Sequence, residues 1–597
     1  MVGMQPNLLD RWQEVDIVKN KTSASKRLIN YAKMESKNLT GGIICTFIRT
    51  ALEIVGPLII GHLLNNYIKK GMTKEDFKSI GLFLILYLLV YIVAGLFSRS
   101  TVLFFERASN GITLHVQKDI FNHVQSLPIS YFDSLPAGSI VSRITNDTNK
   151  LKVMFQNALG DMTTSGIMVI TMFIVLLVNH TRVALELLIL LPIVILIFYD
   201  LRRKYRKYTT EIRRLTSTIN ADINENIQNM EIIQAYNKED LIKKEFDETN
   251  QSIWDNEFEM TKVRSYGGYR AMDIVSYFAS AIVLIYFGVG RITGKYQVDV
   301  GSLYIVLNYV NKMMSSLTTI VTWFGELEQS YASAKHVFDL FEMEPEPELP
   351  EKLNNIEGEV QFKDVYFAYD EEYVLKDINF KVPYKTSAAF VGSTGSGKST
   401  ILNLILNFYS PQEGIVSIDG QDIKNVNKLS LREKMAVVLQ DSFLFEASIR
   451  DNIKLDDNFS DKDIKEALRA VGGDRIISRG IDTIIKEGAK NLSQGEQQLV
   501  SFARAYIREP KLLILDEATS NIDTETESII QKGIEKLKKN RTTLIVAHRL
   551  STIKDVDMIY VLSKGKIIEK GNHEELMNLS GFYRSMYEEQ MEDKVEV

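Results

Sequence analysis

Two things are scarce in this sequence: cysteine, and any excess of positive charge. Cys45 is the only cysteine in 597 residues and lies in an apolar run, which excludes a disulfide framework. Lys and Arg number 70 against 76 Asp and Glu, giving a formal net charge of −6. No global basic field therefore favours nucleic acid as a partner.

The mean hydropathy of −0.05 conceals two unlike halves. The first half alternates long apolar runs with charged stretches, whereas the second has the pattern of a soluble α/β domain. At 597 residues the chain is too long for one domain. Residues 1–40 are polar and basic, so we expect no cleavable signal peptide before the first apolar run.

Six apolar runs in the first half are long enough to cross a bilayer, which takes about 20 residues of helix. They are Gly41–Leu64, Ile80–Phe97, Met162–Asn179, Val183–Tyr199, Met272–Gly290 and Ser302–Phe324. The alternative, a segment buried in the core of a soluble protein, could account for any one such run but is improbable for six of them. Only Asn179–Arg182 separates the third run from the fourth, which predicts a tight hairpin.

Two charged stretches, near 105–155 and 200–268, are too long for simple loops and show helical spacing. We expect the membrane helices to continue through them into the cytoplasm, because the Arg- and Lys-rich segment 200–207 follows the positive-inside rule. An even number of spans then places both termini inside. Short cross-pieces are predicted at Leu127–Ser134 and Ala221–Asn226, suited to docking on another domain; ordinary solvated helical turns are the alternative.

Charged residues within apolar runs are costly and need a reason. Arg49 and Glu53 are four residues apart, so they share a helix face and could pair. Lys312 lies midway along the sixth run, and Asp273 begins the fifth. Either these side chains line a polar cavity between helices, or they form structural pairs and snorkel to the interface. A short interfacial helix is also expected near Arg27–Ala32.

An acidic, proline-rich linker at 341–350 precedes the second half, and a strand is expected at Val360–Val365. After another apolar strand comes a complete phosphate-binding loop of the form G-x-x-x-x-G-K-[ST]. Its residues are Gly392, Ser393, Thr394, Gly395, Ser396, Gly397, Lys398, Ser399 and Thr400. Backbone N–H groups of the loop and the N-terminus of the next helix would bind a polyphosphate. Lys398 would contact its β- and γ-phosphates, and the Ser399 hydroxyl would bind a Mg²⁺ ion.

Two further strands end in candidate catalytic residues. Leu512–Leu515 ends in Asp516 and Glu517, and Thr543–Ala547 ends at His548. Carboxylates at strand ends suit a nucleotide-binding sheet: Asp516 would hold Mg²⁺, and Glu517 would polarise the attacking water. His548 could contact the γ-phosphate and orient that water.

These motifs in this order resemble the ATP-binding cassette (ABC) transporters, and the resemblance covers essentially residues 355–590. Beyond the phosphate loop it includes Gln440, the signature segment Leu492, Ser493, Gln494, Gly495 and Glu496, the Asp-Glu strand, Asp523 of the D-loop, and His548. The segments 127–147 and 225–236 are similar to the coupling regions of the exporter branch. The resemblance implies that Tyr369 stacks on adenine and that Gln440 links the γ-phosphate and Mg²⁺ to the membrane domain.

Two departures from the family pattern stand out. The usual signature has Gly and Gln where this chain has Gln494 and Glu496, and Tyr384 replaces a common Gly. Altered signatures are similar to those of exporter halves that form heterodimers, in which one ATP site hydrolyses poorly. The chain keeps Glu517 and His548, so its own site should be catalytically equipped if a partner supplies an intact signature.

The sequence thus predicts a six-helix all-α transmembrane domain at 1–340, a linker at 341–354 and an α/β P-loop ATP-binding domain at 355–597. The predicted function is ATP-driven export of hydrophobic or amphipathic small molecules across a bacterial cell membrane. The working unit is expected to be a dimer, and a heterodimer is favoured over a homodimer. A lipid flippase is one alternative. An ATP-gated channel or a regulatory subunit is another.

Overall fold

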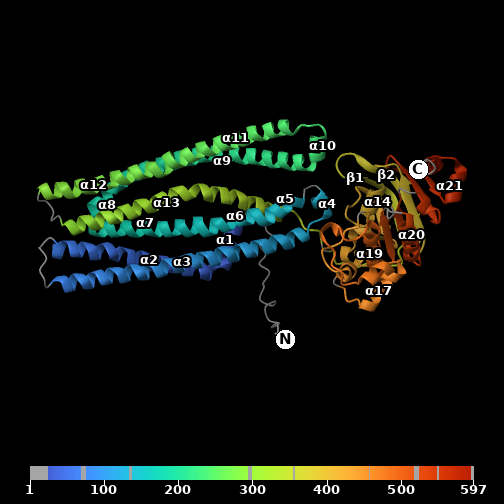
Figure 1. Ribbon diagram of the computed structural model, residues 1–597, viewed down its shortest axis with the longest axis horizontal. Helices are drawn as coiled ribbons and strands as arrows, with labels where there is room; N and C mark the ends of the chain where they lie inside the picture. The colour runs from blue at the N-terminus through green and yellow to red at the C-terminus, as the bar shows by residue number, and fades with distance from the viewer. Residues whose placement is uncertain are drawn as a thin grey trace. The chain divides into compact units, whose positions relative to one another are not determined.

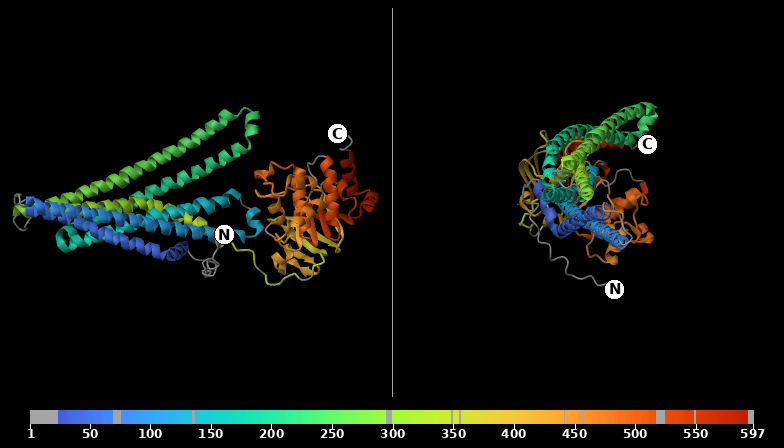
Figure 2. Two further views of the ribbon diagram at one scale, coloured as in Figure 1. Left: turned by 60° about the horizontal axis from the view of Figure 1, so that its bottom comes forward. Right: turned by 90° about the vertical axis from the view of Figure 1, so that its left-hand side faces the viewer.

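The computed structural model describes residues 24–68, 76–133, 137–293, 299–347, 349–353, 356–440, 442–455, 457–516, 524–547 and 550–592. Contacts divide the chain into two units. The helical unit falls within Met1–Leu127 and Leu135–Pro345, and the second unit comprises Pro128–Ser134 and Glu346–Val597. Figures 1 and 2 show the first as long helices and the second as sheets covered by helices.

The helical unit is built mostly from long helices that pack lengthwise (Figure 1). Its described α-helices are α1 (Ala24–Met34), α2 (Ser36–Leu63), α3 (Asp76–Gln125), α5 (Ala137–Ser142), α6 (Thr148–Val153), α7 (Gly160–Asn179), α8 (Thr181–Leu187), α9 (Leu191–Gln228), α10 (Met230–Ala235), α11 (Glu239–Lys262), α12 (Ala271–Thr293) and α13 (Val300–Asp339). Short π- and 3-10-helical turns join several of them end to end.

Within the described residues, five helical stretches are long and apolar enough to cross a membrane. They are Ser36–Ile68, Asp76–Gln125, Gly138–Asn179, Thr181–Gln228 and Glu239–Thr293, and each contains one of the first five predicted runs. The sixth run lies inside α13. The predicted hairpin is present, since α7 ends at Asn179, α8 begins at Thr181, and His180 between them has non-helical backbone angles.

The two predicted cross-pieces fare differently. The first forms the short helix α4 (Ile129–Asp133). The second was placed wrongly: Ala221–Asn226 lies within the continuous helix α9, and the chain turns at Asn229 into α10. The sequence contains no local signal for an earlier end, because residues 221–228 contain no Gly or Pro to end the helix.

The predicted N-terminal helix forms as α1, which packs against α3 and α13 of the helical unit. Arg27 and Tyr31 are 2% and 0% exposed. The Tyr31 hydroxyl donates a 2.8 Å hydrogen bond to Asp119 on α3. Arg27 lies over the ring of Phe341, just beyond α13. Helix α1 therefore joins α3 to the C-terminal end of α13.

The second unit contains two sheets. The four-stranded antiparallel sheet has the order β2-β1-β4-β5, and the six-stranded sheet has the order β10-β9-β3-β8-β7-β6, parallel except for β10. The strands are β1 (Val360–Ala368), β2 (Tyr373–Val382), β3 (Ser387–Gly392), β4 (Glu413–Ile418), β5 (Gln421–Asp422), β6 (Met435–Val438), β7 (Leu512–Asp516), β8 (Thr542–Val546), β9 (Met558–Ser563) and β10 (Lys566–Gly571).

Helices cover the sheets of this unit. They are α14 (Lys398–Ile405), α15 (Lys428–Arg432), α16 (Ile449–Lys454), α17 (Asp461–Ala470), α18 (Asp474–Arg479), α19 (Gln494–Ile507), α20 (Thr524–Lys538), α21 (His573–Leu579) and α22 (Phe582–Glu592). Strand β3 is buried on both faces: Ala388 and Phe390 join one hydrophobic cluster, and Ala389 and Val391 the other. This is the pattern of a parallel strand with helices on both sides.

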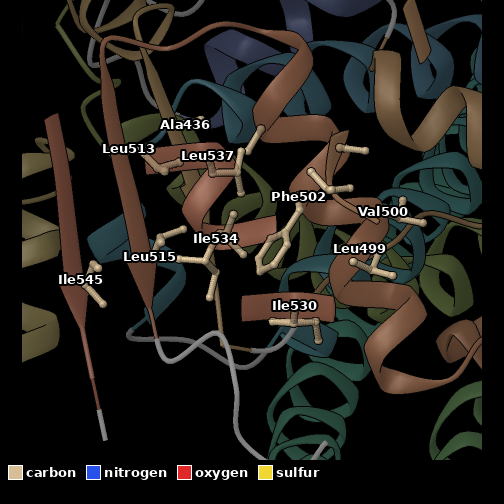
Figure 3. Packing of buried hydrophobic residues seen from close by; sticks show 14 of the residues in the cluster. Ala436, Leu499, Val500, Phe502, Leu513, Leu515, Ile530, Ile534, Leu537 and Ile545 are labelled. Atoms are coloured by element: carbon tan, nitrogen blue, oxygen red, sulfur yellow. The ribbon is translucent and has the colours of Figure 1, made fainter. Parts of the chain in front are cut away.

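Figure 3 shows how helices pack on one face of the six-stranded sheet. Phe502 of α19 is fully buried and points toward Ile530 and Ile534 of α20. Leu513 and Leu515 of β7 belong to the same cluster. This packing fixes α19 relative to β7.

The acidic linker is tied to the second unit. Glu346 pairs with Lys428 at 2.6 Å and with Arg432 at 3.5 Å. The side-chain amide of Asn427 donates to the carbonyl of Leu349 at 2.9 Å. From Glu346 on, the linker is part of the folded unit and not a loose tether.

Candidate nucleotide site

The carboxyl ends of the parallel strands meet at one edge of the six-stranded sheet. Neighbours run in the order β3, β8, β7 and β6, with Asp516 opposite Val546 and Val438 opposite Leu515. The phosphate loop leaves β3, Asp516 ends β7, and Gln440 follows β6 by two residues. This is the edge at which α/β sheets bind ligands. The predicted residues Glu517, Asp523 and His548 lie outside the described residues.

Three glycines shape the phosphate loop. Gly392, Gly395 and Gly397 have φ angles of 152°, 79° and 102°, which L-residues rarely adopt. A Cβ at Gly397 would lie 2.6 Å from the Leu375 side chain, and a Cβ at Gly392 would collide with the Leu562 carbonyl. The loop thus needs glycine both for its backbone angles and for its close approach to neighbouring strands.

Lys398 and Ser396 show that this loop suits a polyanion. The Lys398 ammonium donates hydrogen bonds to the carbonyls of Gly392 at 2.8 Å and Ser393 at 3.0 Å, so the loop curls around its charge. The buried Ser396 hydroxyl has no hydrogen-bond partner among the described residues, and such groups are expensive to leave unsatisfied. Helix α14 begins at Lys398 and adds its positive dipole end.

The predicted Mg²⁺ ligands are compatible with that ion but do not form a cage. No group of three or more His, Cys, Asp or Glu in the described part of the chain is arranged to hold a metal. Ser399 and Gln440 are exposed, and Asp516 is half-buried, all with oxygen donors at the same sheet edge. Mg²⁺ is usually held by few protein oxygens together with substrate phosphates and water, which fits this sparse set.

Tyr369 lies beside the phosphate-loop helix with its ring partly open, since the residue is 44% exposed. Its hydroxyl accepts a 3.0 Å hydrogen bond from Asn403 and donates a 3.4 Å one to Thr400. Phe367 and Tyr409 contact the ring edge-on, with centroids 4.9 Å and 5.0 Å away. The ring is therefore held in one orientation, as a stacking surface for a flat base requires.

Sequence reasoning missed the role of Tyr409. Its hydroxyl donates a 2.5 Å hydrogen bond to Asp133 of α4, which groups with the second unit. Burial, together with this carboxylate, raises the pKa of the Tyr409 phenol well above its ordinary value. The phenol therefore remains a donor at neutral pH, and α4 is connected to the aromatic group around Tyr369.

The signature segment forms the N-terminus of α19. Ser493 caps the helix by accepting from the Glu496 amide, while the Glu496 carboxylate accepts from the Ser493 amide at 3.0 Å. Leu492 and Gly495 are buried, whereas Gln494 is exposed. Glu496 thus completes a capping box, as the usual Gln could also do, and the pattern S-x-x-E was visible in the sequence.

Arg504, farther along α19, was not singled out by the sequence. Its guanidinium donates to the Asn452 carbonyl at 2.8 Å and to the Phe443 carbonyl at 3.3 Å. Burial lowers the pKa of Arg504. The Asn452 side chain in turn accepts from the Phe445 amide at 2.8 Å. Helix α19 therefore also anchors the segment that follows Gln440.

A second candidate site lies in the helical unit. A cavity of about 530 Å³ is lined by Arg49, Glu53, Asp161, Thr164, Ser165, Met168, Lys312, Ser315, Ser316, Thr319 and Trp323. Glu53 pairs with Arg49 at 2.8 Å and with Lys312 of α13 at 3.1 Å. The predicted pairing of Arg49 with Glu53 is confirmed, and the paired side chains also line a cavity. Asp161 was missed, and Asp273 does not line it.

Comparison with known proteins agrees with this organisation. Residues 39–317 match the ABC transporter transmembrane region, and residues 375–520 match the ABC transporter domain. The chain is 41% identical to the "Probable multidrug resistance ABC transporter ATP-binding/permease protein YheH" of Bacillus subtilis, over 87% of this chain and 78% of that protein. It is 29% identical to the "ATP-dependent lipid A-core flippase" of Vibrio vulnificus, over 94% and 97%.

A solved structure extends the likeness to the whole fold. The "Structure of a bacterial Atm1-family ABC exporter with ATP bound" superposes with a TM-score of 0.82 at 25% identity, covering 93% of this chain and 98% of that one. The predicted fold class, a helical transmembrane domain followed by a nucleotide-binding domain, is confirmed. The chain belongs to the ABC transporter family and is an ATP-hydrolysing exporter of that family.

Proposed function

We propose that this chain is one half of a dimeric exporter that moves hydrophobic or amphipathic small molecules out across a bacterial cell membrane. The observation that carries the proposal is the glycine-shaped phosphate loop, with its buried Ser396 hydroxyl, in a chain that also has long apolar helices. The proposal includes a sixth span in α13, both termini in the cytoplasm, and domain limits near 340 and 355.

The ATP-binding roles follow from the sheet edge. Tyr369 stacks on the base, while the loop from Gly392 to Thr400 and the Lys398 ammonium hold the phosphates. Ser399, Gln440 and Asp516 hold Mg²⁺, which supplies charge neutralisation at the phosphates when bound. The Lys398 ammonium donates hydrogen bonds to two loop carbonyls, so it already lies where the loop would surround a phosphate.

Hydrolysis is assigned to residues at the ends of β7 and β8. Glu517 polarises the attacking water and His548 orients it. The signature residues from Leu492 to Glu496 act on nucleotide held by the other subunit, and Asp523 lies in the loop that follows Glu517 in sequence. Each ATP is then shared by two chains, so the working unit is a dimer, and the altered signature favours a heterodimer.

Nucleotide binding reaches the membrane through α4. Because the Asp133 carboxylate is bonded to Tyr409, movement of the nucleotide domain is transmitted to the helices that α4 connects. Closure of two nucleotide domains on ATP favours one orientation of the membrane helices, and hydrolysis removes that bias. Retention of Glu517 favours a hydrolysing motor over an ATP-gated channel.

The cavity near Glu53 supports an amphipathic cargo. Hydroxyl-bearing and charged side chains share its lining with Met168 and Trp323, so it can accept a molecule with both polar and apolar parts. A lipid flippase is the second candidate, supported by the named activity of the Vibrio vulnificus relative.

Two experiments test the proposal. Co-purification from the native membrane tells whether the chain assembles with itself or with a different ABC subunit. ATPase activity of the resulting complex is then measured with amphipathic drugs and with lipids; stimulation by drugs alone supports drug export, and stimulation by lipid alone supports flipping. Ion currents that open with ATP would instead identify a channel.

A further inference from the structure

The signature segment of this chain carries a negative charge at the place where ATP-binding cassette signatures usually have neutral Gln. Glu496 occupies the third position of α19, within the first turn. A helix N-terminus attracts anions because its N–H groups and dipole present positive charge. A carboxylate in that turn opposes the attraction for a second anion, such as a triphosphate held by another subunit.

Arg479 supplies the missing compensation. Its guanidinium donates to Glu496 Oε2 at 3.3 Å from the C-terminal end of α18. The same carboxylate oxygen accepts from the Ser493 amide at 3.0 Å. The Glu496 side chain is 19% exposed, so Arg479 faces a carboxylate that solvent screens only in part.

The pairing leaves the Ser493 hydroxyl proton available. In the capping box the Ser493 oxygen accepts from the Glu496 amide at 3.2 Å, so its O–H can still donate to an incoming phosphate oxygen. The Glu496 carboxylate, by contrast, is held back toward Ser493 N and Arg479. The first turn of α19 thus keeps its donors while its one negative charge is neutralised.

We propose that Arg479 is a positioning residue that neutralises Glu496 and so lets this signature accept the triphosphate bound by the other subunit. The inference rests on the proposed function, because it requires ATP shared between two chains. Arg479 also donates to the Asn491 carbonyl at 3.2 Å, so a purely structural role in holding the loop is the competing explanation.

The test uses the full-length dimer, as isolated from its membrane, in a Glu517→Gln background that slows hydrolysis. Retention of radiolabelled Mg-ATP is titrated after free nucleotide is removed. Arg479→Ala should raise the half-saturating ATP concentration about fivefold or more at the sites that this signature completes. Adding Glu496→Gln to Arg479→Ala should return it to within about twofold of the parent, since no charge then needs neutralising.

Controls separate charge from structure. The Arg479 side chain is 43% exposed, so Arg479→Ala should fold, and its unfolding temperature is compared with the parent's. Arg479→Lys keeps the charge and should retain most of the affinity. Arg469→Ala removes the same charge from the exposed face of α17 and should change nothing.

The outcomes are distinguishable. If Arg479→Ala retains ATP like the parent, or if the double variant stays as weak as Arg479→Ala, the inference about charge is overturned. If the Glu517→Gln parent itself retains no nucleotide in the assembled dimer, the proposed function fails and this inference fails with it.

Discussion

The Tyr409 hydroxyl and the Asp133 carboxylate are joined by a 2.5 Å hydrogen bond, and the Tyr409 ring meets Tyr369 edge-on at 5.0 Å. Asp133 of α4 is therefore linked to the ring proposed to stack on adenine through two contacts, both made by Tyr409. Aromatic contacts and hydrogen bonds at this spacing couple positions when they differ between two states. This relationship is the route that the proposed function assigns to coupling between the nucleotide domain and the membrane helices.

Tyr409→Phe removes the hydroxyl and keeps the ring beside Tyr369. We expect ATPase activity without cargo to stay within about twofold, and transport per ATP hydrolysed to fall about five- to tenfold, because α4 loses its anchor. Transport and ATPase activity are measured together in proteoliposomes. Tyr373→Phe is the matched control, since it removes a more exposed 3.3 Å bond to Glu413 in the same domain. Unchanged coupling in Tyr409→Phe would contradict the role.

Gly397→Ala tests the phosphate loop. The substitution combines a φ of 102° with a Cβ placed 2.6 Å from a Leu375 methyl group, so the loop or that side chain must shift. Strain of this kind costs about 1–3 kcal/mol, and ATP affinity should fall more than tenfold. Binding is measured by nucleotide titration of the purified dimer.

Gly395→Ala is the control for that substitution. The φ angle of Gly395 is 79°, yet a Cβ at this position would meet no atom within 4 Å. Alanine there would therefore strain the backbone without colliding with a neighbouring side chain. ATP binding should suffer less than in Gly397→Ala. Equal losses would show that backbone angle alone, and not the approach to Leu375, accounts for the glycine.

Glu53→Gln should leave Arg49 and Lys312 beside each other without their shared carboxylate. Breaking a fully buried ion pair costs about 3–5 kcal/mol, and the cost here should be smaller because the Arg49 and Lys312 side chains are 29% and 26% exposed. We expect a lower unfolding temperature and loss of cargo-stimulated ATPase activity. Adding Lys312→Met should recover stability, because one unpaired charge is then removed.

The ATPase of the Glu53→Gln/Lys312→Met variant separates structure from cargo binding. If the cavity contacts cargo, the double variant should regain its stability while the stimulation of its ATPase activity by cargo stays altered. Full recovery of both would assign the three charges to folding alone.

Phe502→Ala tests the packing that fixes α19 on β7. The ring is fully buried between α19 and α20, and losing it should cost about 3–5 kcal/mol. Thermal unfolding of the full chain in detergent measures the loss. Leu429→Ala, at a residue that is 68% exposed, should shift the midpoint little. A small shift in Phe502→Ala would mean that α19 is held mainly by other contacts, such as Arg504.

The sequence predicted features that depend on local pattern. The phosphate loop, the strands before it and before Asp516, and the pairing of Arg49 with Glu53 all follow from spacing within one element. The turn at His180 was also visible, since polar residues interrupt two apolar runs there. Such features need no knowledge of what the rest of the chain does.

Features that depend on distant parts of the chain were missed or misplaced. Nothing in the sequence joins Tyr409 to Asp133 or Arg479 to Glu496, or places Asp161 in the cavity that Lys312 also lines, because tertiary packing brings these residues together. The second cross-piece was placed at Ala221–Asn226, inside α9, since a polar stretch with helical spacing does not reveal where a long helix ends.

The most direct test of the account is ATP-dependent uptake of a fluorescent amphipathic dye into inside-out membrane vesicles, comparing the wild-type complex with Glu517→Gln. The account predicts that wild-type vesicles accumulate dye only with Mg-ATP, and that Glu517→Gln vesicles bind ATP but accumulate none. Equal accumulation by both, or accumulation without nucleotide, would contradict it.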